Sequence, residues 1–254
     1  YFKFTLYLLL ILAVCTSCET EYGDRRNIRK FYFPIADLDD GLVYEYQAVG
    51  NDSFPPVYWY YRNIKQKDGL YLVGTAYGAD LLPTQLITEA VVDNGMLLED
   101  MYLFANDTLG KQVQVTVNIE SGSAFPFLVK DEKGVFLYKV NWSMPDSPDV
   151  STTLIKNRRF VGDTTYMYEG QSHPAVIFSV QELVEQRASG SLELSYEGTE
   201  IYAKNIGLVQ VSKDIHTGMT QTYALARTYP MSALEAKFRQ LTEETEDGQQ
   251  NNKK

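Results

Sequence analysis

The sequence predicts an all-β, mainly antiparallel fold, a curved sheet or an open or half β-barrel that ends in a short C-terminal helix. Runs rich in Val, Ile, Tyr, Phe and Thr recur from Phe31 to about Tyr229, broken by Gly, Asp, Asn and Pro, which is typical of short strands. Three breaks have the composition of hairpin turns: KDG at 67–69, DNG at 93–95 and DEKG at 131–134. So long a series of strands should curve or close, because flat open edges invite aggregation.

Strand-like runs lie on both sides of one polar segment, SMPDSPDVS at 143–151. The runs before it are 42–49, 57–65, 70–77, 85–92, 96–104, 112–119 and 135–142. The runs after it are 152–160, 164–168, 174–187, 191–196, 199–204, 207–213 and 220–228. Residues 143–151 could divide two lobes or form a long loop, and we favour the loop because the runs on either side are alike.

The hydrophobic period changes at residues 231–241, MSALEAKFRQL. Leu234, Phe238 and Leu241 fall on one helical face there, and Pro230 suits a helix start. The polar residues 242–254 should be disordered. We therefore expect one β-rich domain over residues 31–241.

The N-terminus has the pattern of an export signal. Lys3 precedes the apolar run FTLYLLLILAV, which is shorter than the about 20 residues needed to span a bilayer. The two cysteines of the chain, Cys15 and Cys18, follow that run. A redox pair or half a metal site is an alternative, but a zinc site would need further ligands, and the chain has only two histidines. A second alternative is an ordinary secretory signal in which the two cysteines are coincidental.

The residues TSC at 16–18 resemble the lipobox of bacterial lipoproteins, particularly those of the Bacteroidetes type. This resemblance implies that residues 1–17 are a signal peptide and that Cys18, rather than Cys15 after Val14, carries the lipid. It also implies a lipid-anchored outer-membrane protein on the periplasmic or cell-surface face, because acidic residues such as Glu19 and Glu21 resemble a surface-export signal. Polar residues 18–30 would form a flexible tether. Since the chain starts at Tyr1 without Met, we expect residues upstream.

Composition and motifs disfavour several functions. A net charge of −10 disfavours nucleic acid as a partner. Phosphate-loop, nucleophile-elbow and zinc-protease patterns are absent from the sequence. We therefore predict no catalytic residue, metal or cofactor, and a protein that is not an enzyme.

Aromatic residues are the most prominent candidates for a site. The run VYWYY should place Tyr58 and Tyr60 on one face of a strand and Trp59 and Tyr61 on the other. They could form a platform for a glycan, peptide or lipid, or they could simply pack in the core.

The last strands carry a second resemblance. GTEIYAKNIGLVQVSKD at 198–214 and TYALARTY at 222–229 resemble the closing hairpins of uncharacterised envelope β-proteins grouped loosely with half-barrel lipoprotein carriers. Asn205 stands where that group commonly has a small residue. Gly207 would permit a bulge or a close approach between strands. In addition, DTL at 107–109 and DTT at 163–165 resemble an O-glycosylation motif, which implies glycans on Thr108 and Thr164 in exposed turns.

Three functions follow as hypotheses. The leading one is a lipid-anchored envelope protein that binds an apolar ligand or a peptide on a concave β face without catalysis. The second is an accessory subunit docked on an outer-membrane complex. The third is a glycan-acting surface protein.

Overall fold

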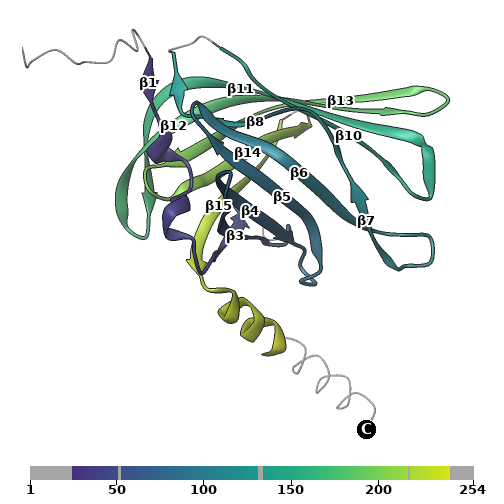
Figure 1. Cartoon of the computed structure of the whole chain (residues 1–254), viewed down its shortest axis with the longest axis horizontal. Helices are drawn as coiled ribbons and strands as arrows, with labels where there is room; N and C mark the ends of the chain where they lie inside the picture. The colour runs from purple at the N-terminus through teal and green to yellow at the C-terminus, as the bar shows by residue number, and fades with distance from the viewer. Residues whose placement is uncertain (1–24, 51–52, 131–133, 217, 241–254) are drawn as a thin grey trace, which may run out of the picture.

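The computed structural model describes residues 25–50, 53–130, 134–216 and 218–240, and most of them form strands (Figure 1). Two 3₁₀ turns, η1 (Arg29–Phe31) and η2 (Ile35–Asp37), precede the main sheet. The strands are β1 (Arg26–Asn27), β2 (Leu42–Ala48), β3 (Val57–Lys65), β4 (Leu70–Tyr77), β5 (Pro83–Val92), β6 (Gly95–Asn106), β7 (Gln112–Thr116), β8 (Asn118–Pro126), β9 (Leu128–Val129), β10 (Phe136–Met144), β11 (Ser147–Tyr168), β12 (Gln171–Arg187), β13 (Ser191–Ala203), β14 (Gly207–His216) and β15 (Met219–Tyr229). Within this described part, no helix is long and apolar enough to cross a membrane.

The main sheet is antiparallel and closes on itself. Its order is β5-β4-β3-β2-β15-β14-β13-β12-β11-β10-β8-β6-β7, and β5 also pairs with β6 along the whole hairpin. β7 and β8 pair with opposite ends of β6, so together they occupy the position of a single strand beside β6 in the closed sheet. The all-β, antiparallel, barrel-like fold is therefore confirmed, together with the short C-terminal helix.

The segment 143–151 is part of the sheet. Met144 of β10 pairs with Ser147 of β11, and Ser143 pairs with Ser151, so the chain reverses tightly around Pro145 and Asp146. The structure thus shows a hairpin where the polar composition suggested a long loop. β11 and β12 are long, 22 and 17 residues, and the tips of the β10–β11 and β12–β13 hairpins extend to one side of the barrel, as does the β6–β7 hairpin (Figure 1).

Aromatic and aliphatic side chains fill the interior. Phe125, Phe160 and Phe178 are each at most 1% exposed. The ring of Tyr202 contacts the rings of Phe125 and Phe178 at centroid distances of 4.8 and 5.8 Å. The concave face of the sheet is therefore a packed core over much of its length, rather than an open ligand cavity.

The residues before β2 close one end of the barrel. β1 pairs with β9, and Ile28 is fully buried, so the flexible tether expected over 18–30 does not include residues 26–30. Composition misled here, because the isolated Ile28 among charged residues is what fixes this segment. Phe33 follows it into the core, and its ring lies 4.3 Å from that of Tyr61.

Gly207 permits a close approach, but to the N-terminal segment. Its φ is +105°, and a Cβ there would collide with the ring of Phe33. Asn205, in the same turn, has a φ of +62°, which asparagine tolerates better than most residues. Asn205 N–H also donates to the carbonyl of Lys30 at 2.8 Å. This turn therefore holds the N-terminal segment against the end of the barrel.

A helix over residues 231–240 packs on the outside of the barrel. Leu234 is fully buried in a cluster with Val43 and Tyr58, and Phe238 packs against the same cluster. The Lys237 ammonium lies 3.4 Å from a carboxylate oxygen of Glu45. The expected apolar face is thus the contact face. Leu241 and residues 242–254 lie outside the described residues.

Candidate binding cleft

A cleft opens where β13 and β14 separate. Their pairing begins at Gly198↔Lys213 and continues toward Ala203↔Gly207. Within the described part of the chain, residues 191–197 of β13 pair with β12 alone, on their other side, and the end of β14 remains paired with β15. The space between them has a volume of about 720 Å³. Its lining consists of Leu194, Ser195, Tyr196, Glu197, Asp214, Ile215, Gly218, Met219 and Thr220.

Local sequence explains why the strands part at this point. A Cβ on Gly198 would collide with the carbonyl oxygen of Ser212, so only glycine permits the close crossing at the base of the cleft. Register shifts occur in the β13–β14 ladder between Ile201 and Tyr202 and in the β14–β15 ladder near Asp214. Such bulges increase the local twist of a strand, which favours divergence of neighbouring strands.

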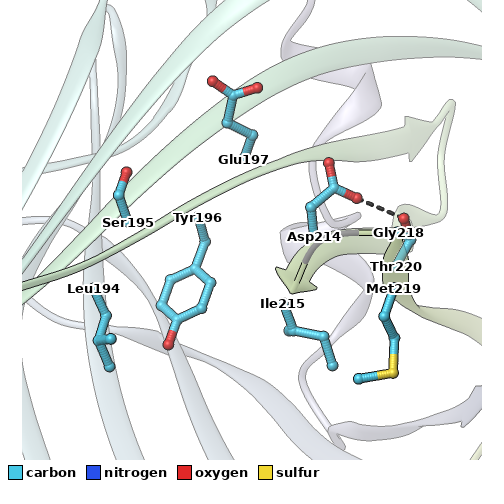
Figure 2. A pocket seen from close by; sticks show the side chains of 9 residues that line it. All are labelled: Leu194, Ser195, Tyr196, Glu197, Asp214, Ile215, Gly218, Met219 and Thr220. Carbon is cyan, nitrogen blue, oxygen red and sulfur yellow. Dashed lines mark hydrogen bonds between the residues drawn. The ribbon is translucent and has the colours of Figure 1, made fainter.

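The two faces of the cleft differ in polarity. Figure 2 shows the apolar side chains Leu194, Tyr196, Ile215 and Met219 on one side of the strands. By alternation along β13, this is the side on which Tyr202 packs in the core. Ser195, Glu197 and Asp214 lie on the opposite, outer side, where Asp214 accepts a hydrogen bond from Thr220 at 2.6 Å. Leu194 is 44% and Met219 50% exposed. The cleft therefore offers apolar surface to a ligand on one face only.

A network of paired charges lies beneath the cleft. Lys213 pairs with Glu182, and its ammonium lies 3.9 Å from the ring centroid of Tyr196. The ammonium of Lys156 lies 3.6 Å from a carboxylate oxygen of Glu182 and 3.5 Å from one of Glu200. Arg158 donates from Nε to Glu200 at 2.7 Å. The network joins β11, β12, β13 and β14 and so fixes the floor from which the cleft opens.

Electrostatics keep the buried Glu200 ionised. Burial alone would raise its pKa, but the charges of Arg158 and Lys156 outweigh burial and hold the pKa at about 2. A hydrogen bond of 2.9 Å from the Tyr202 hydroxyl acts in the same direction. These charges pair with one another, although among the described residues the buried Nη1 of Arg158 has no hydrogen-bond partner. The carboxylates of the described residues that line the cleft itself are those of Glu197 and Asp214.

Solved bacterial structures resemble this chain. One is provisionally described as a lipoprotein from Parabacteroides distasonis ATCC 8503, with a TM-score of 0.48, 12% identity, and coverage of 78% of this chain and 98% of that chain. Another, from Bacteroides fragilis NCTC 9343, is provisionally described as an exported protein with a YmcC-like fold, at TM-score 0.47, 11% identity, and coverage of 78% and 99%. The hypothetical lipoprotein YmcC from Escherichia coli K12 matches with a TM-score of 0.36 and 13% identity, and the match covers 76% of this chain and 88% of that chain.

No family model and no curated protein matches the sequence. The structural neighbours are thus described as lipoproteins or exported proteins. At identities of 11–13% and TM-scores below 0.5, no binding property or activity carries over from them to this chain.

The four aromatic residues of β3 lie on the two faces that the alternation predicted. Tyr58 is 2% exposed on the outer face, where it packs with Leu234 of the C-terminal helix, and Tyr60 packs beside it. Trp59 and Tyr61 stack with centroids 5.4 Å apart and pack against the interior core. None of the four lines the cleft.

The two candidate glycosylation sites have different surroundings. Thr108 is exposed in the turn between β6 and β7, and its N–H donates to Asp146 at 2.6 Å. Thr164, however, lies half-buried within β11, opposite Ala175 of β12, so the exposed turn expected there is wrong. The strand β11 continues through this segment: Val161 forms a bulge, and Gly162 and Asp163 pair with Ile177 and Val176 of β12.

The predicted lipidation site, Cys18, and the predicted signal peptide of residues 1–17 lie outside the described residues. The cleft residues were not singled out from the sequence. The run LELSYE at 192–197 alternates apolar and polar residues, which predicts a strand with one solvent-exposed face. Alternation does not reveal that one edge of the strand lacks a partner.

Proposed function

We propose that this chain is a lipid-anchored protein of the bacterial outer membrane that binds an extended apolar ligand in the β13–β14 cleft without catalysing a reaction. The observation that carries the proposal is the cleft itself, with an apolar face open to solvent and polar groups along one side. Ligand sites in proteins commonly have volumes of roughly 300–1,000 Å³, a range that includes this one.

The exposed apolar side chains make the cleft a favourable place for burial. Leu194 and Met219 line it, and Leu192, 55% exposed, follows on the same face of β13. Covering such side chains contributes about 25 cal/mol per Å² of apolar surface removed from water. The packed interior, by contrast, leaves Trp59 and Tyr61 engaged with other rings of the chain. The cleft is therefore the better-supported place for a ligand.

A polar substitution in the cleft tests the binding site. Met219→Glu should weaken binding of N-phenyl-1-naphthylamine, a neutral apolar dye, about tenfold or more, because the dye would have to desolvate a carboxylate. Titration of the dye by fluorescence measures the effect. Met167→Glu is the matched control, since Met167 is 63% exposed on β11 and does not line the cleft. Equal dye affinity in the two variants would contradict the proposed site.

The anchor is tested separately at Cys18. In cells fed a clickable fatty-acid analogue, the wild-type protein should be labelled and recovered with outer-membrane fractions, whereas Cys18→Ala should be unlabelled and released. Acyl chains hold a protein at a bilayer through about 0.8 kcal/mol for each buried CH₂. Cys15→Ala is the control and should behave as wild type. Labelling that persists in Cys18→Ala and disappears in Cys15→Ala would move the lipid to Cys15.

A further inference from the structure

We infer that the ligand of the cleft is an extended peptide segment in which apolar and basic residues alternate, bound as an added β-strand along the free edge of β13. The inference rests on the proposed function and specifies the class of ligand. It follows from three properties of the cleft: its strand edges, the polarity of its faces and its charge.

The walls of the cleft are strand edges. Among the described residues, no ladder joins residues 191–197 of β13 to the end of β14, although each has a sheet partner on its other side. In an antiparallel sheet, alternate residues of such an edge direct N–H and C=O groups outward. A seven-residue edge spans roughly 23 Å, enough to pair with a short extended peptide. Proteins often bind peptides by adding a strand to an exposed edge.

The polarity of the cleft matches an added strand. A strand placed beside β13 would direct successive side chains to opposite faces of the sheet. One set would meet Leu194, Tyr196 and Met219, and the other would lie on the outer face with Ser195 and Glu197 (Figure 2). Alternation of apolar and polar residues in the ligand therefore corresponds to the two faces of the cleft.

The charge of the cleft specifies the polar residues. Among the described residues that line the cleft, Glu197 and Asp214 carry carboxylates and none carries a cationic side chain. Glu193, exposed on the same face of β13 as Glu197, adds a third acidic group, and the guanidinium of Arg187, which pairs with Glu185, lies near it. The nearby ammonium of Lys213 pairs with Glu182 below the cleft. Basic side chains on the outer face of the ligand are therefore complementary.

An acyl chain fits these observations less well. It would cover Leu194 and Met219, but it would leave the backbone groups of the β13 edge without a partner and make no use of Glu197 or Asp214. A peptide strand can cover the apolar side chains, pair its basic residues with the carboxylates, and exchange backbone hydrogen bonds with the edge of β13.

A designed peptide tests the inference. A nine-residue peptide of alternating Val and Lys, labelled at one end, should bind the full chain in a fluorescence anisotropy titration. The combined substitution Glu197→Gln and Asp214→Asn should weaken binding about 3- to 10-fold and reduce its dependence on salt. The Val–Glu peptide of the same length should not bind. A Val–Lys peptide N-methylated on alternate residues, so that its paired edge lacks N–H donors, should lose most of its affinity.

The outcomes separate this inference from the proposed function. Binding of the apolar dye or of a fatty acid at Met219, with no binding of the Val–Lys peptide, would overturn the inference and leave the proposed function standing. Failure of the dye, the fatty acid and the peptide alike would overturn both. The N-methylated peptide can be made in two forms, methylated on the odd or on the even residues. If both forms bind with the same affinity as the unmodified peptide, strand addition would also be overturned. These peptide comparisons use the unaltered chain, so they do not depend on the folding of a variant.

Discussion

Replacement of Glu200 by glutamine is expected to lower the free energy of unfolding by about 3–5 kcal/mol, because it leaves a buried arginine without its counter-charge. Arg158 donates two hydrogen bonds to Glu200, at 2.7 and 3.4 Å, and Lys156 lies 3.5 Å from the same carboxylate. Glutamine keeps the shape of the side chain but removes the charge. Urea denaturation followed by circular dichroism measures the change.

A surface ion pair provides the control. Glu120 pairs with Lys139 at 2.5 Å, but its side chain is 40% exposed, so Glu120→Gln should change stability by less than about 1 kcal/mol. The double variant Arg158→Met, Glu200→Leu should regain much of the loss, since it removes both members of the most buried pair while Lys156 keeps Glu182 as its partner. Similar small effects for Glu200→Gln and Glu120→Gln would show that the network does not hold the barrel together.

Replacement of Glu89 by glutamine is expected to change how stability depends on pH. Burial raises the pKa of Glu89 to about 7, although the hydrogen bond from Tyr32 and the charge of Arg158 act to lower it. A carboxyl whose pKa is higher in the folded than in the unfolded state contributes its full stabilisation of the fold at pH values below the unfolded-state pKa. That contribution is lost as the pH rises through the folded-state pKa. The wild type should therefore lose up to about 3 kcal/mol between pH 4.5 and 8 from this group.

Unfolding curves measured from pH 4.5 to 8 test this expectation. The slope in that range should largely disappear in Glu89→Gln, which should become more stable than the wild type at pH 8. Glu99→Gln, an exposed substitution on the neighbouring strand β6, retains the buried carboxyl and should keep the wild-type slope. If Glu89→Gln keeps that slope too, Glu89 is not the group responsible.

Much of the fold was predictable because its strands follow local rules. The run at 57–65 coincides with β3, and 70–77 coincides with β4, because alternation and β-branched or aromatic residues identify a strand without knowledge of its partners. The helix after Pro230 was predictable in the same way. Local patterns are less informative about chain direction: 143–151 forms a tight hairpin, and 160–164 runs through a bulge, although both contain turn residues.

The candidate site could not be predicted, because it depends on what is not paired. The sequence identified the aromatic run at 58–61 by its composition, and the structure places those side chains against the core and the C-terminal helix. Leu194 and Met219 are ordinary strand residues in the sequence and become exceptional only where the β13–β14 ladder stops. Gly198 was the available signal, since a glycine within a strand often marks a close approach or a bulge.

Hydrogen exchange can show directly whether a peptide pairs with the β13 edge. In the free protein, the backbone N–H groups of residues 191–197 that face the cleft should exchange rapidly, while those paired with β12 are protected. Saturation with the alternating Val–Lys peptide should slow the exposed set about tenfold or more. Unchanged exchange over residues 191–197, with protection appearing elsewhere in the chain, would show that the peptide does not add a strand to β13.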